Sequence, residues 1–369
     1  YFMKFKILIF ILVIVSILSI LSLKKYYEKF SNPKINIWII NLDKDKDRIS
    51  KFKQNLNLNG NNVNLIRYPA ILGKNVKNIL KKSNKINFFE ISNSEDLDIL
   101  DYDLFSRYLN KNDIDKIINC AAFVGGISYG YKYQADLLSI NSQMAINLYK
   151  ASKDSNVSML INPISNCAYP EKYKEYEESK FWDGKIHDSV FNYGLSKRLF
   201  VGLGEAYYKQ FNFSSSNIVM SNMYGPLDHF EIERSHALGA LILKIYKAKK
   251  NNTSFIDIWG TGKPIREWLY VQDGAESLMR ALELGPGHHF FNVGSGKGYS
   301  VIEIATKIAK EFEWDGDFKL DNSKPDGVLE KKVNPKLGEK ILNWSPKTTI
   351  DEGIKLTVGW FIENEKNIT

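Results

Sequence analysis

Tyrosine and lysine recur four residues apart in this chain, at Tyr149/Lys153, Tyr176/Lys180, Tyr193/Lys197 and Tyr246/Lys250. On a helix, residues with this spacing lie on the same face, so each pair would place a phenol beside an ammonium group. Such a pair can share one proton, and its tyrosine can then act as a general acid toward a developing alkoxide. Such a proton donor would suit a reaction that forms an alkoxide, for example the reduction of a ketone.

Tyr193/Lys197 has the sequence context that this chemistry requires. The apolar run 157–165, "VSMLINPIS", is a predicted strand that ends at Ser165, and Tyr193 begins the next clear helix. Ligands bind at the carboxyl ends of the strands in parallel α/β sheets, where Ser165 would supply a hydroxyl. Tyr176/Lys180 is predicted to lie in a polar loop, Tyr149/Lys153 at the helix end that is remote from the strand ends, and Tyr246/Lys250 at the end of a basic helix. We therefore predict that Tyr193/Lys197 is the catalytic pair.

The elements that would position this pair alternate between strands and helices from residue 86 onward. Apolar runs predict strands, and amphipathic stretches predict the helices between them. The strands are expected at 86–92, 115–123, 157–165, 215–222 and 288–295, and the helices at 135–153, 195–211, 236–249, 274–284 and 301–312. This alternation predicts an α/β fold with a doubly wound, Rossmann-like parallel sheet. Because the pattern loosens after Pro226, we also predict an interleaved, smaller substrate lobe.

Composition excludes several classes of function. The chain has 369 residues, of which 44% are hydrophobic and 25% charged, so it is long enough for a large core. Its net charge of +8 comes from scattered lysines without an arginine-rich run, which argues against nucleic acid as a partner. Cys120 and Cys167 are the two cysteines, and they provide neither a disulfide framework nor a metal-binding set.

The N-terminal region is different in kind. Residues 7–23 carry no charge, and lysines flank them on both sides. Seventeen residues at a helical rise of 1.5 Å span about 26 Å, which is near the minimum for a bilayer core. The segment lacks a small-residue cleavage site, so we expect an uncleaved single-pass anchor within residues 1–30. The flanking charges favour a cytosolic body for this membrane-anchored protein.

Seven motifs occur in an order that is similar to one enzyme family. They are "NCAAFVGG" (119–126), "SNCAYP" (165–170), "YGLSK" (193–197), "SNMYGP" (221–226), "SHALGALILK" (235–244), "IWGTGKPIREWLYVQD" (258–273) and "SKPDG" (323–327). The set resembles the GDP-L-fucose synthases, which are extended short-chain dehydrogenases/reductases, over about residues 86–365. The resemblance implies epimerisation and NADPH-dependent reduction of GDP-4-keto-6-deoxymannose, and a homodimer.

The resemblance also implies a role for individual residues. Cys167 would be the base and His236 the acid of the epimerisation, because proton exchange beside a ketone needs groups on opposite faces of the sugar. Tyr193 would protonate the C4 oxygen, Lys197 would lower the pKa of that tyrosine and hold the nicotinamide ribose, and Ser165 would donate a hydrogen bond. The implied contacts to NADP(H), beyond Tyr193 and Lys197, are Gly73, Ala121, Ala122, Asn141 and Asn222.

The implied contacts to the GDP-sugar are Lys244, Trp259, Arg266, Asp326 and Lys331. Lys244 stands where the family usually has an arginine, so it keeps the charge but loses the bidentate fork. Glu330 replaces another residue that is usually basic.

The family's opening G-x-x-G-x-x-G turn is missing. By register it falls on residues 67–73, where Gly73 is the one glycine and Arg67 and Ala70 occupy glycine positions. Residues 36–80 instead resemble the start of glycosyltransferase family 25. We therefore expect a stub at 31–85, a core at 86–225 and 273–300, and a substrate lobe at 226–272 and 301–369. The alternatives are a catalytically impaired nucleotide-sugar-binding protein or subunit and, less favoured, a glycosyltransferase.

A strand from this stub should fill the first-strand position of the sheet beside residues 86–91, because a parallel sheet without that strand would expose an apolar edge. Residues 35–41 and 63–68 are the two candidates.

The missing glycines predict weak cofactor binding. Side chains at these positions keep backbone amides away from the pyrophosphate, so several charge-assisted hydrogen bonds of about 1.5–3 kcal/mol each would be lost. We expect the Kd for NADPH to be weaker by about two or more powers of ten than a glycine turn allows. Titration of cofactor fluorescence measures this, and tight micromolar binding would contradict it.

Overall fold

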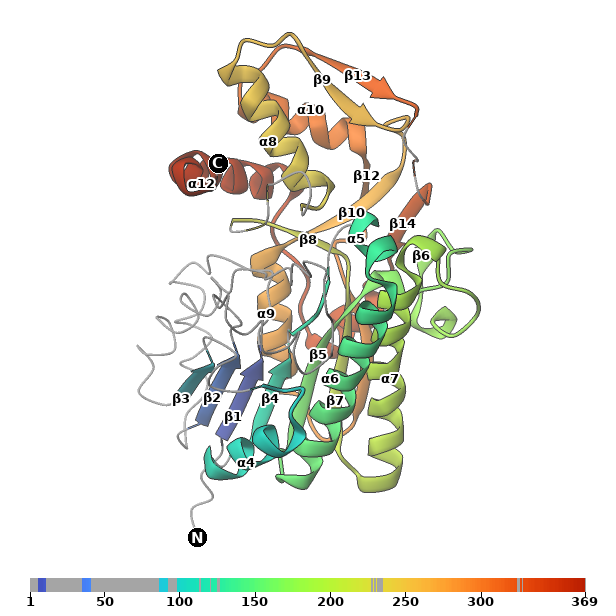
Figure 1. Cartoon of the computed structure of the whole chain (residues 1–369), viewed down its shortest axis with the longest axis vertical. Coiled ribbons are helices and arrows are strands. Elements are labelled where there is room, and N and C mark those ends of the chain that lie inside the picture. Colours follow the sequence, from blue (N-terminus) through green and yellow to red (C-terminus); the bar gives the residue numbers. More distant parts are fainter. Residues whose placement is uncertain are drawn as a thin grey trace, which may run out of the picture.

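The computed structural model describes residues 6–10, 35–40, 86–91, 98–112, 114–119, 121–124, 127–226, 228, 230, 235–323, 326 and 328–368. A seven-stranded parallel sheet forms the larger part, in the order β11-β7-β5-β4-β1-β2-β3 (Figure 1). Its strands are β1 (Lys6–Phe10), β2 (Ile35–Ile40), β3 (Ile86–Ile91), β4 (Lys116–Asn119), β5 (Met159–Ser165), β7 (Ser214–Met220) and β11 (His288–Val293). This order confirms the predicted Rossmann-like fold, whose strand sequence reverses between β1 and β4.

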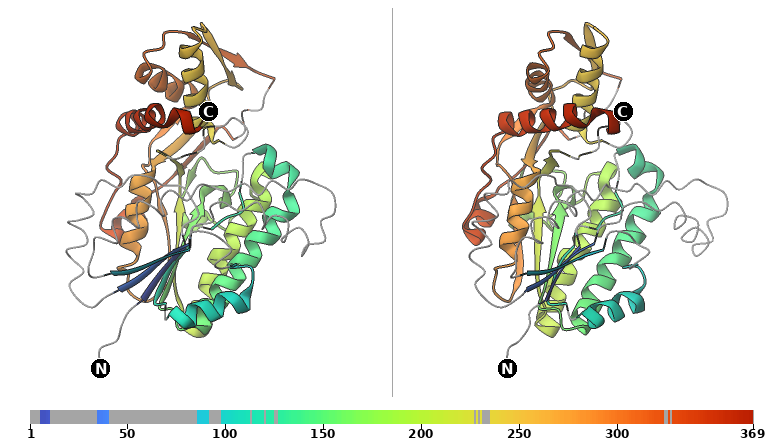
Figure 2. Two further views of the ribbon diagram at one scale, coloured as in Figure 1. Left: turned by 60° about the vertical axis from the view of Figure 1, so that its left-hand side comes forward. Right: turned by 90° about the vertical axis from the view of Figure 1, so that its left-hand side faces the viewer.

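Helices cover both faces of the sheet, as a parallel sheet requires. Helices α6 and α7 pack on one face, with α4 against α6, and α9 packs on the other face (Figure 2). Their bounds are α4 (Tyr102–Asn112), α6 (Gln134–Asp154), α7 (Phe191–Phe211) and α9 (Val271–Ala281), and the short α5 (Ile127–Lys132) precedes α6.

Strand β1 corrects the expected membrane anchor. Residues 6–10 pair in parallel with β4 on one side and β2 on the other, so residues 7–10 are strand and not the start of a membrane-spanning helix. Strands of parallel sheets read as continuous apolar runs, as membrane helices do, so the sequence pattern does not distinguish the two. Residues 11–23 lie outside the described residues. Within the described ranges, no helix combines the length and apolarity needed to cross a bilayer.

Strand β2 is one of the two candidates and does lie beside residues 86–91, but it does not fill the first-strand position, because β1 lies between β2 and β4 where the strand order reverses. Ile35–Ile40 pairs in parallel with β3 over six residues, from Ile35 opposite Ile86 to Ile40 opposite Ile91. The other candidate, 63–68, lies outside the described residues, as does the expected cofactor contact Gly73.

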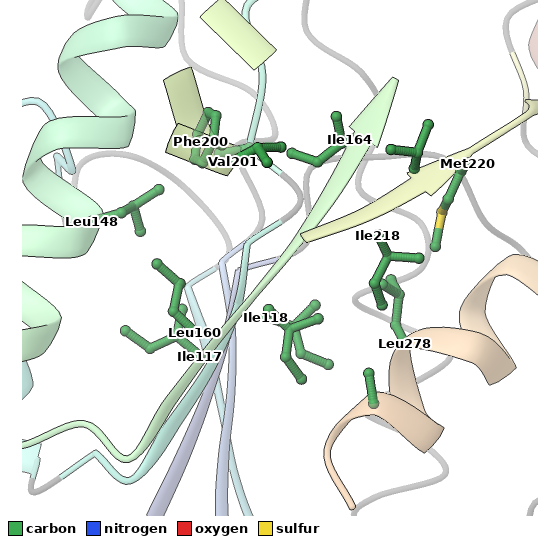
Figure 3. Close-up of a cluster of buried hydrophobic side chains, with 14 of the residues drawn as sticks. Ile117, Ile118, Leu148, Leu160, Ile164, Phe200, Val201, Ile218, Met220 and Leu278 are labelled. Carbon is green, nitrogen blue, oxygen red and sulfur yellow. The ribbon is translucent and has the colours of Figure 1, made fainter. Parts of the chain in front are cut away.

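The core of the larger part lies between the sheet and its helices. Apolar side chains of β4, β5 and β7 meet those of α6 and α7 on one face and of α9 on the other (Figure 3). The labelled members are Ile117, Ile118, Leu148, Leu160, Ile164, Phe200, Val201, Ile218, Met220 and Leu278.

A row of asparagines crosses the centre of the sheet. Asn119 Nδ2 donates to Asn162 Oδ1 at 3.2 Å, and Asn162 Nδ2 donates to Asn217 Oδ1 at 3.1 Å. The Tyr149 hydroxyl accepts from Asn162 and Asn217 at 3.3 and 3.1 Å. Each of these side chains is nearly or fully buried, so the hydrogen bonds replace the water that burial removes.

A second hydrophobic cluster lies above the carboxyl ends of the main sheet (Figure 1). Its helices are α8 (Ala237–Lys250), α10 (Val301–Glu311) and α12 (Ile350–Ile368), while α11 (Lys336–Leu342) packs beside β11. The smaller strands are β6 (Glu175–Tyr176), β8 (Asn222–Tyr224), β9 (Phe255–Trp259), β10 (Ile265–Tyr270), β12 (Gly298–Ser300), β13 (Asp317–Asp321) and β14 (Glu330–Val333). Leu342 and Trp344 pack in the core of the larger part. The predicted domain boundaries stay a prediction.

Removing the central amide of the asparagine row should destabilise the protein. Asn162→Ala leaves the buried Asn119 Nδ2 without its acceptor, at a cost of about 1–3 kcal/mol, while Asn217 keeps its hydrogen bonds with Tyr149. Asn110→Ala is the control, because its amide bonds Ser106 O on the exposed surface and its loss should cost less than about 0.5 kcal/mol. Urea unfolding measures both, and equal free energies for the two variants would contradict the prediction.

Candidate active site

A cavity of about 740 Å³ lies where the main sheet meets the second cluster. Its walls bring together most of the predicted site residues, from segments far apart in the sequence. They are Ala122, Ser165, Cys167, Tyr193, Lys197, Asn222, His236, Arg266, Asp326 and Lys331. A cavity of this size is in the range of cofactor and small-molecule sites.

Ser165 and Cys167 share one tight turn at the end of β5. Ser165 is still extended, with φ −77° and ψ 140°, and it caps the 3₁₀ turn Asn166–Ala168. Its Oγ accepts a hydrogen bond from the Cys167 backbone N–H at 3.2 Å. This turn leaves the free thiol of Cys167 half-buried in the cavity wall.

Tyr193 and Lys197 lie in the first two turns of α7. Lys197 is 4% exposed, and its Nζ lies 3.5 Å from Pro163 O and 5.6 Å from the Tyr193 ring centroid. An ammonium group is costly to bury without polar or aromatic neighbours, and these neighbours offset part of that cost. The pair therefore places a buried positive charge beside a phenol in the cavity wall.

The other three tyrosine–lysine pairs, all within the described part of the chain, do not line this cavity. Tyr149 is bonded into the asparagine row, and burial raises its pKa to about 12. Tyr176 stacks on Tyr169 with ring centroids 4.6 Å apart, and burial raises its pKa above the usual value. Tyr246 accepts from Lys250 at 3.3 Å on the exposed face of α8.

His236 reaches the cavity from the other side. It is the residue immediately before α8, and it lines the cavity together with Ala237. Cys167 belongs to the main-sheet side and His236 to the helix of the second cluster, so the two groups approach the cavity from different structural units.

Two cations sit side by side in the cavity wall. Arg266 on β10 is opposite Lys331 on β14 in the parallel register. Arg266 NH2 donates to Asp326 O at 3.3 Å, while the Asp326 carboxylate accepts from the Thr261 N–H and hydroxyl at 2.7 and 2.8 Å. Burial lowers the pKa of Arg266 from its usual value. Neighbouring like charges favour an anionic ligand at this wall.

Four predicted contacts lie outside the cavity lining. Trp259 is 55% exposed, and Lys244 Nζ lies 5.6 Å from its ring centroid while donating to Asp257 O at 2.8 Å. Ala121 is buried, and Asn141 bonds the backbone N–H and C=O of Phe123, both at 2.8 Å. Asn141 therefore holds the loop that carries Ala122, and its amide is occupied by protein.

The comparisons with known proteins agree with this geometry. The model of the NAD dependent epimerase/dehydratase family matches residues 64–294, which is more than half of the chain. The chain belongs to this family.

Relatives within the family are nucleotide-sugar enzymes. The chain is 32% identical over 250 residues to "Probable GDP-L-fucose synthase 1" of Oryza sativa subsp. japonica, covering 67% of this chain and 76% of that protein. It is 32% identical over 295 residues to the GDP-L-colitose synthase of Yersinia pseudotuberculosis, covering 79% and 95%. A GDP-L-fucose synthetase from Naegleria fowleri bound to NADP superposes with a TM-score of 0.71 at 29% identity, covering 80% and 90%.

The resemblance of residues 36–80 to glycosyltransferase family 25 finds no support. The epimerase family model begins at residue 64, within this stretch, and residues 35–40 pair inside the Rossmann-like sheet.

Glu267 is a buried residue near the site that the motif analysis missed. Its carboxylate accepts from the Val333 and Gly296 backbone N–H groups at 2.7 and 2.9 Å, so it joins β10, β14 and the turn after β11. A Cβ on Gly294 would lie 2.1 Å from Glu267 Oε1, which explains that glycine. The signal in the sequence is an acidic residue directly before the apolar stretch "WLY" (268–270).

Glu267 should make stability fall as pH rises. Burial raises its pKa from 4.5 to about 7, so between these values the folded state holds a proton that the unfolded state has released. The free energy of unfolding then decreases by up to about 1.4 kcal/mol per pH unit over this window and levels off above it. Urea unfolding from pH 5 to 8 should show this slope in the native protein and a flatter profile in Glu267→Gln.

Glu303→Gln is the control with the opposite sign. Hydrogen bonds from Ser300 lower the pKa of the exposed Glu303, so its contribution is present above its ordinary pKa and is lost as pH falls. A Glu267→Gln profile parallel to that of the native protein would contradict the assignment to Glu267.

Proposed function

We propose that the protein is a nucleotide-sugar epimerase-reductase that resembles GDP-L-fucose synthase and converts GDP-4-keto-6-deoxymannose to GDP-L-fucose with NADPH. The observation that carries this proposal is the gathering of Ser165, Cys167, Tyr193, Lys197 and His236 around one cavity, beside the cations Arg266 and Lys331. Its relatives and the NADP-bound structural neighbour support it.

In the epimerisation, Cys167 and His236 act as base and acid, since they approach the cavity from different structural units. The Cys167 thiolate removes a proton from a carbon beside the C4 ketone, and the electron pair moves to the ketone oxygen to form an enolate. Ser165 donates a hydrogen bond to that oxygen. His236 then returns a proton to the opposite face of the same carbon, and the ketone re-forms with inverted configuration.

Reduction uses the tyrosine–lysine pair. NADPH supplies the hydride to C4, which is where the cofactor enters the chemistry. Tyr193 gives its phenolic proton to the developing alkoxide, and the buried ammonium of Lys197 stabilises the phenolate that remains. The residues fit the cofactor because Lys197, Ala122 and Asn222 line the cavity at the carboxyl ends of the strands.

The GDP end of the substrate is placed at the cavity wall formed by β10 and β14. Arg266 and Lys331 would bind the diphosphate, and Asp326 would hold Arg266 in place. The exposed pair Lys244 and Trp259 stays a proposed contact for the nucleotide. The homodimer implied by the resemblance also stays a prediction. A catalytically impaired binding protein is not favoured, because every residue of the expected catalytic set lines one cavity.

Two variants should separate the half-reactions. Tyr193→Phe removes the proton that the alkoxide needs and should slow NADPH oxidation by about 10²-fold or more while sparing deuterium uptake into the sugar from D₂O. Cys167→Ser should first impair deuterium uptake. Absorbance follows NADPH oxidation, and mass spectrometry follows the exchange.

Tyr246→Phe is the matched control, because Tyr246 belongs to an exposed pair of the same spacing. It should leave both rates within about twofold of native. The choice of catalytic pair is wrong if Tyr149, Tyr176 or Tyr246 proves essential for hydride transfer and Tyr193 does not.

A further inference from the structure

Helix α7 uses two neighbouring rows of side chains at the candidate site. One row contains Tyr193 and Lys197, which line the cavity. The next row contains Gly194 and Arg198, which are again four residues apart and therefore share a face. This second row touches the turn that carries Cys167.

Gly194 allows the helix and the turn to come together. A Cβ built on Gly194 would lie 2.8 Å from Cys167 O and 3.0 Å from Ile186 Cγ2, closer than real Cβ contacts allow. Gly202 on the same helix offers a contrast, because its Cβ would meet one atom within 4 Å, Trp182 Cη2 at 3.9 Å. Gly202 therefore provides a matched position on the same helix where an added Cβ meets no such close contact.

Arg198 fastens the same turn by its planar guanidinium. Nε donates to Ala168 O at 2.8 Å, and NH1 donates to Gly184 O at 3.0 Å. The guanidinium carbon lies 5.6 and 5.8 Å from the ring centroids of Phe181 and Trp182. A single planar group thus links the residue after Cys167 to a second part of the loop, which a lysine cannot do with one point charge.

We propose that Gly194 and Arg198 are positioning residues that fix Cys167 relative to Tyr193. This inference rests on the proposed function, in which Cys167 and Tyr193 act on the same sugar ring. Helix α7 then sets the geometry of both half-reactions. Its first row carries Tyr193, which donates a proton to the C4 oxygen, and its second row holds the turn that carries the base Cys167. Misplacing a catalytic group by about 1 Å can cost about 10²-fold in rate, so small shifts of the turn should be measurable.

The first experiment reads the position of Cys167 without any enzyme activity. The rate of Cys167 alkylation by iodoacetamide is followed by peptide mass spectrometry, which separates it from Cys120. Gly194→Ala and Arg198→Met should each change this rate by about threefold or more, and in Arg198→Met the freed turn should react faster. Arg198→Lys should fall between native and Arg198→Met, because one of the two hydrogen bonds can re-form.

Two controls on the same helix separate positioning from general destabilisation. Gly202→Ala adds the same methyl group in open space, and Lys209→Met removes a cation whose partner Glu205 is on the surface. Both should alkylate within about twofold of native. Gly202→Ala should unfold at the native temperature or above it, since alanine is favoured over glycine in a helix. Lys209→Met should unfold close to the native temperature, because an exposed ion pair contributes little to stability. If Gly194→Ala or Arg198→Met does not fold, Arg198→Lys carries the test.

The second experiment measures deuterium uptake from D₂O into GDP-4-keto-6-deoxymannose. We expect about tenfold slower exchange in Gly194→Ala and Arg198→Met, with the two controls unchanged. Unchanged alkylation in both site variants overturns the proposal, and so does altered alkylation with native exchange. If the native protein itself exchanges nothing, the proposed function fails, while the alkylation rates still decide whether Gly194 and Arg198 position Cys167.

Discussion

The hydrogen-bonded row Asn119–Asn162–Asn217 is the interaction on which the site depends, because it sets the register of three central strands. Asn162 is opposite Asn217, and three residues farther along the same strands Ser165 is opposite Met220. At about 3.3 Å per residue, a slip of two residues would move Ser165 by about 6.6 Å along the sheet. Apolar side chains alone would pack nearly as well after such a slip, whereas the amides would lose their partners. The polar row therefore holds Ser165 level with Ser221 and Asn222 at the cavity.

The parts that the sequence predicts well are those that local patterns determine. Buried parallel strands read as short apolar runs and their helices as longer amphipathic stretches, so β5 and α7 are found close to their expected bounds. The choice of Tyr193/Lys197 among four equal spacings also succeeded as far as placement goes, because topology puts strand ends and the following helix starts at one edge. Its catalytic role rests on the proposed experiments.

The parts that it predicts poorly depend on long-range packing. An uncharged run such as Ile7–Phe10 is compatible with a membrane helix and with a central strand, and pairing with β2 and β4 distinguishes the two. Asn141 shows a second limit, because its spacing is compatible with a cofactor contact while its amide is occupied by Phe123 and Leu137. Glu267 shows a third limit. Its carboxylate accepts hydrogen bonds from the backbone N–H groups of Gly296 and Val333, which are distant in sequence.

Glu267 and Arg266 are adjacent in β10, yet their side chains point to opposite faces of the strand. Glu267 is buried under the turn after β11, while Arg266 lines the cavity, so the carboxylate is directed away from its neighbouring cation. The Asp326 carboxylate accepts from Thr261 and still attracts Arg266, to which it offers its backbone oxygen, but it balances only one of the two positive charges. The wall formed by Arg266 and Lys331 thus keeps a net positive charge in a partly buried place, which costs stability in the free protein. A ligand carrying two adjacent negative charges would offset that cost, and a diphosphate between sugar and nucleoside has this chemistry.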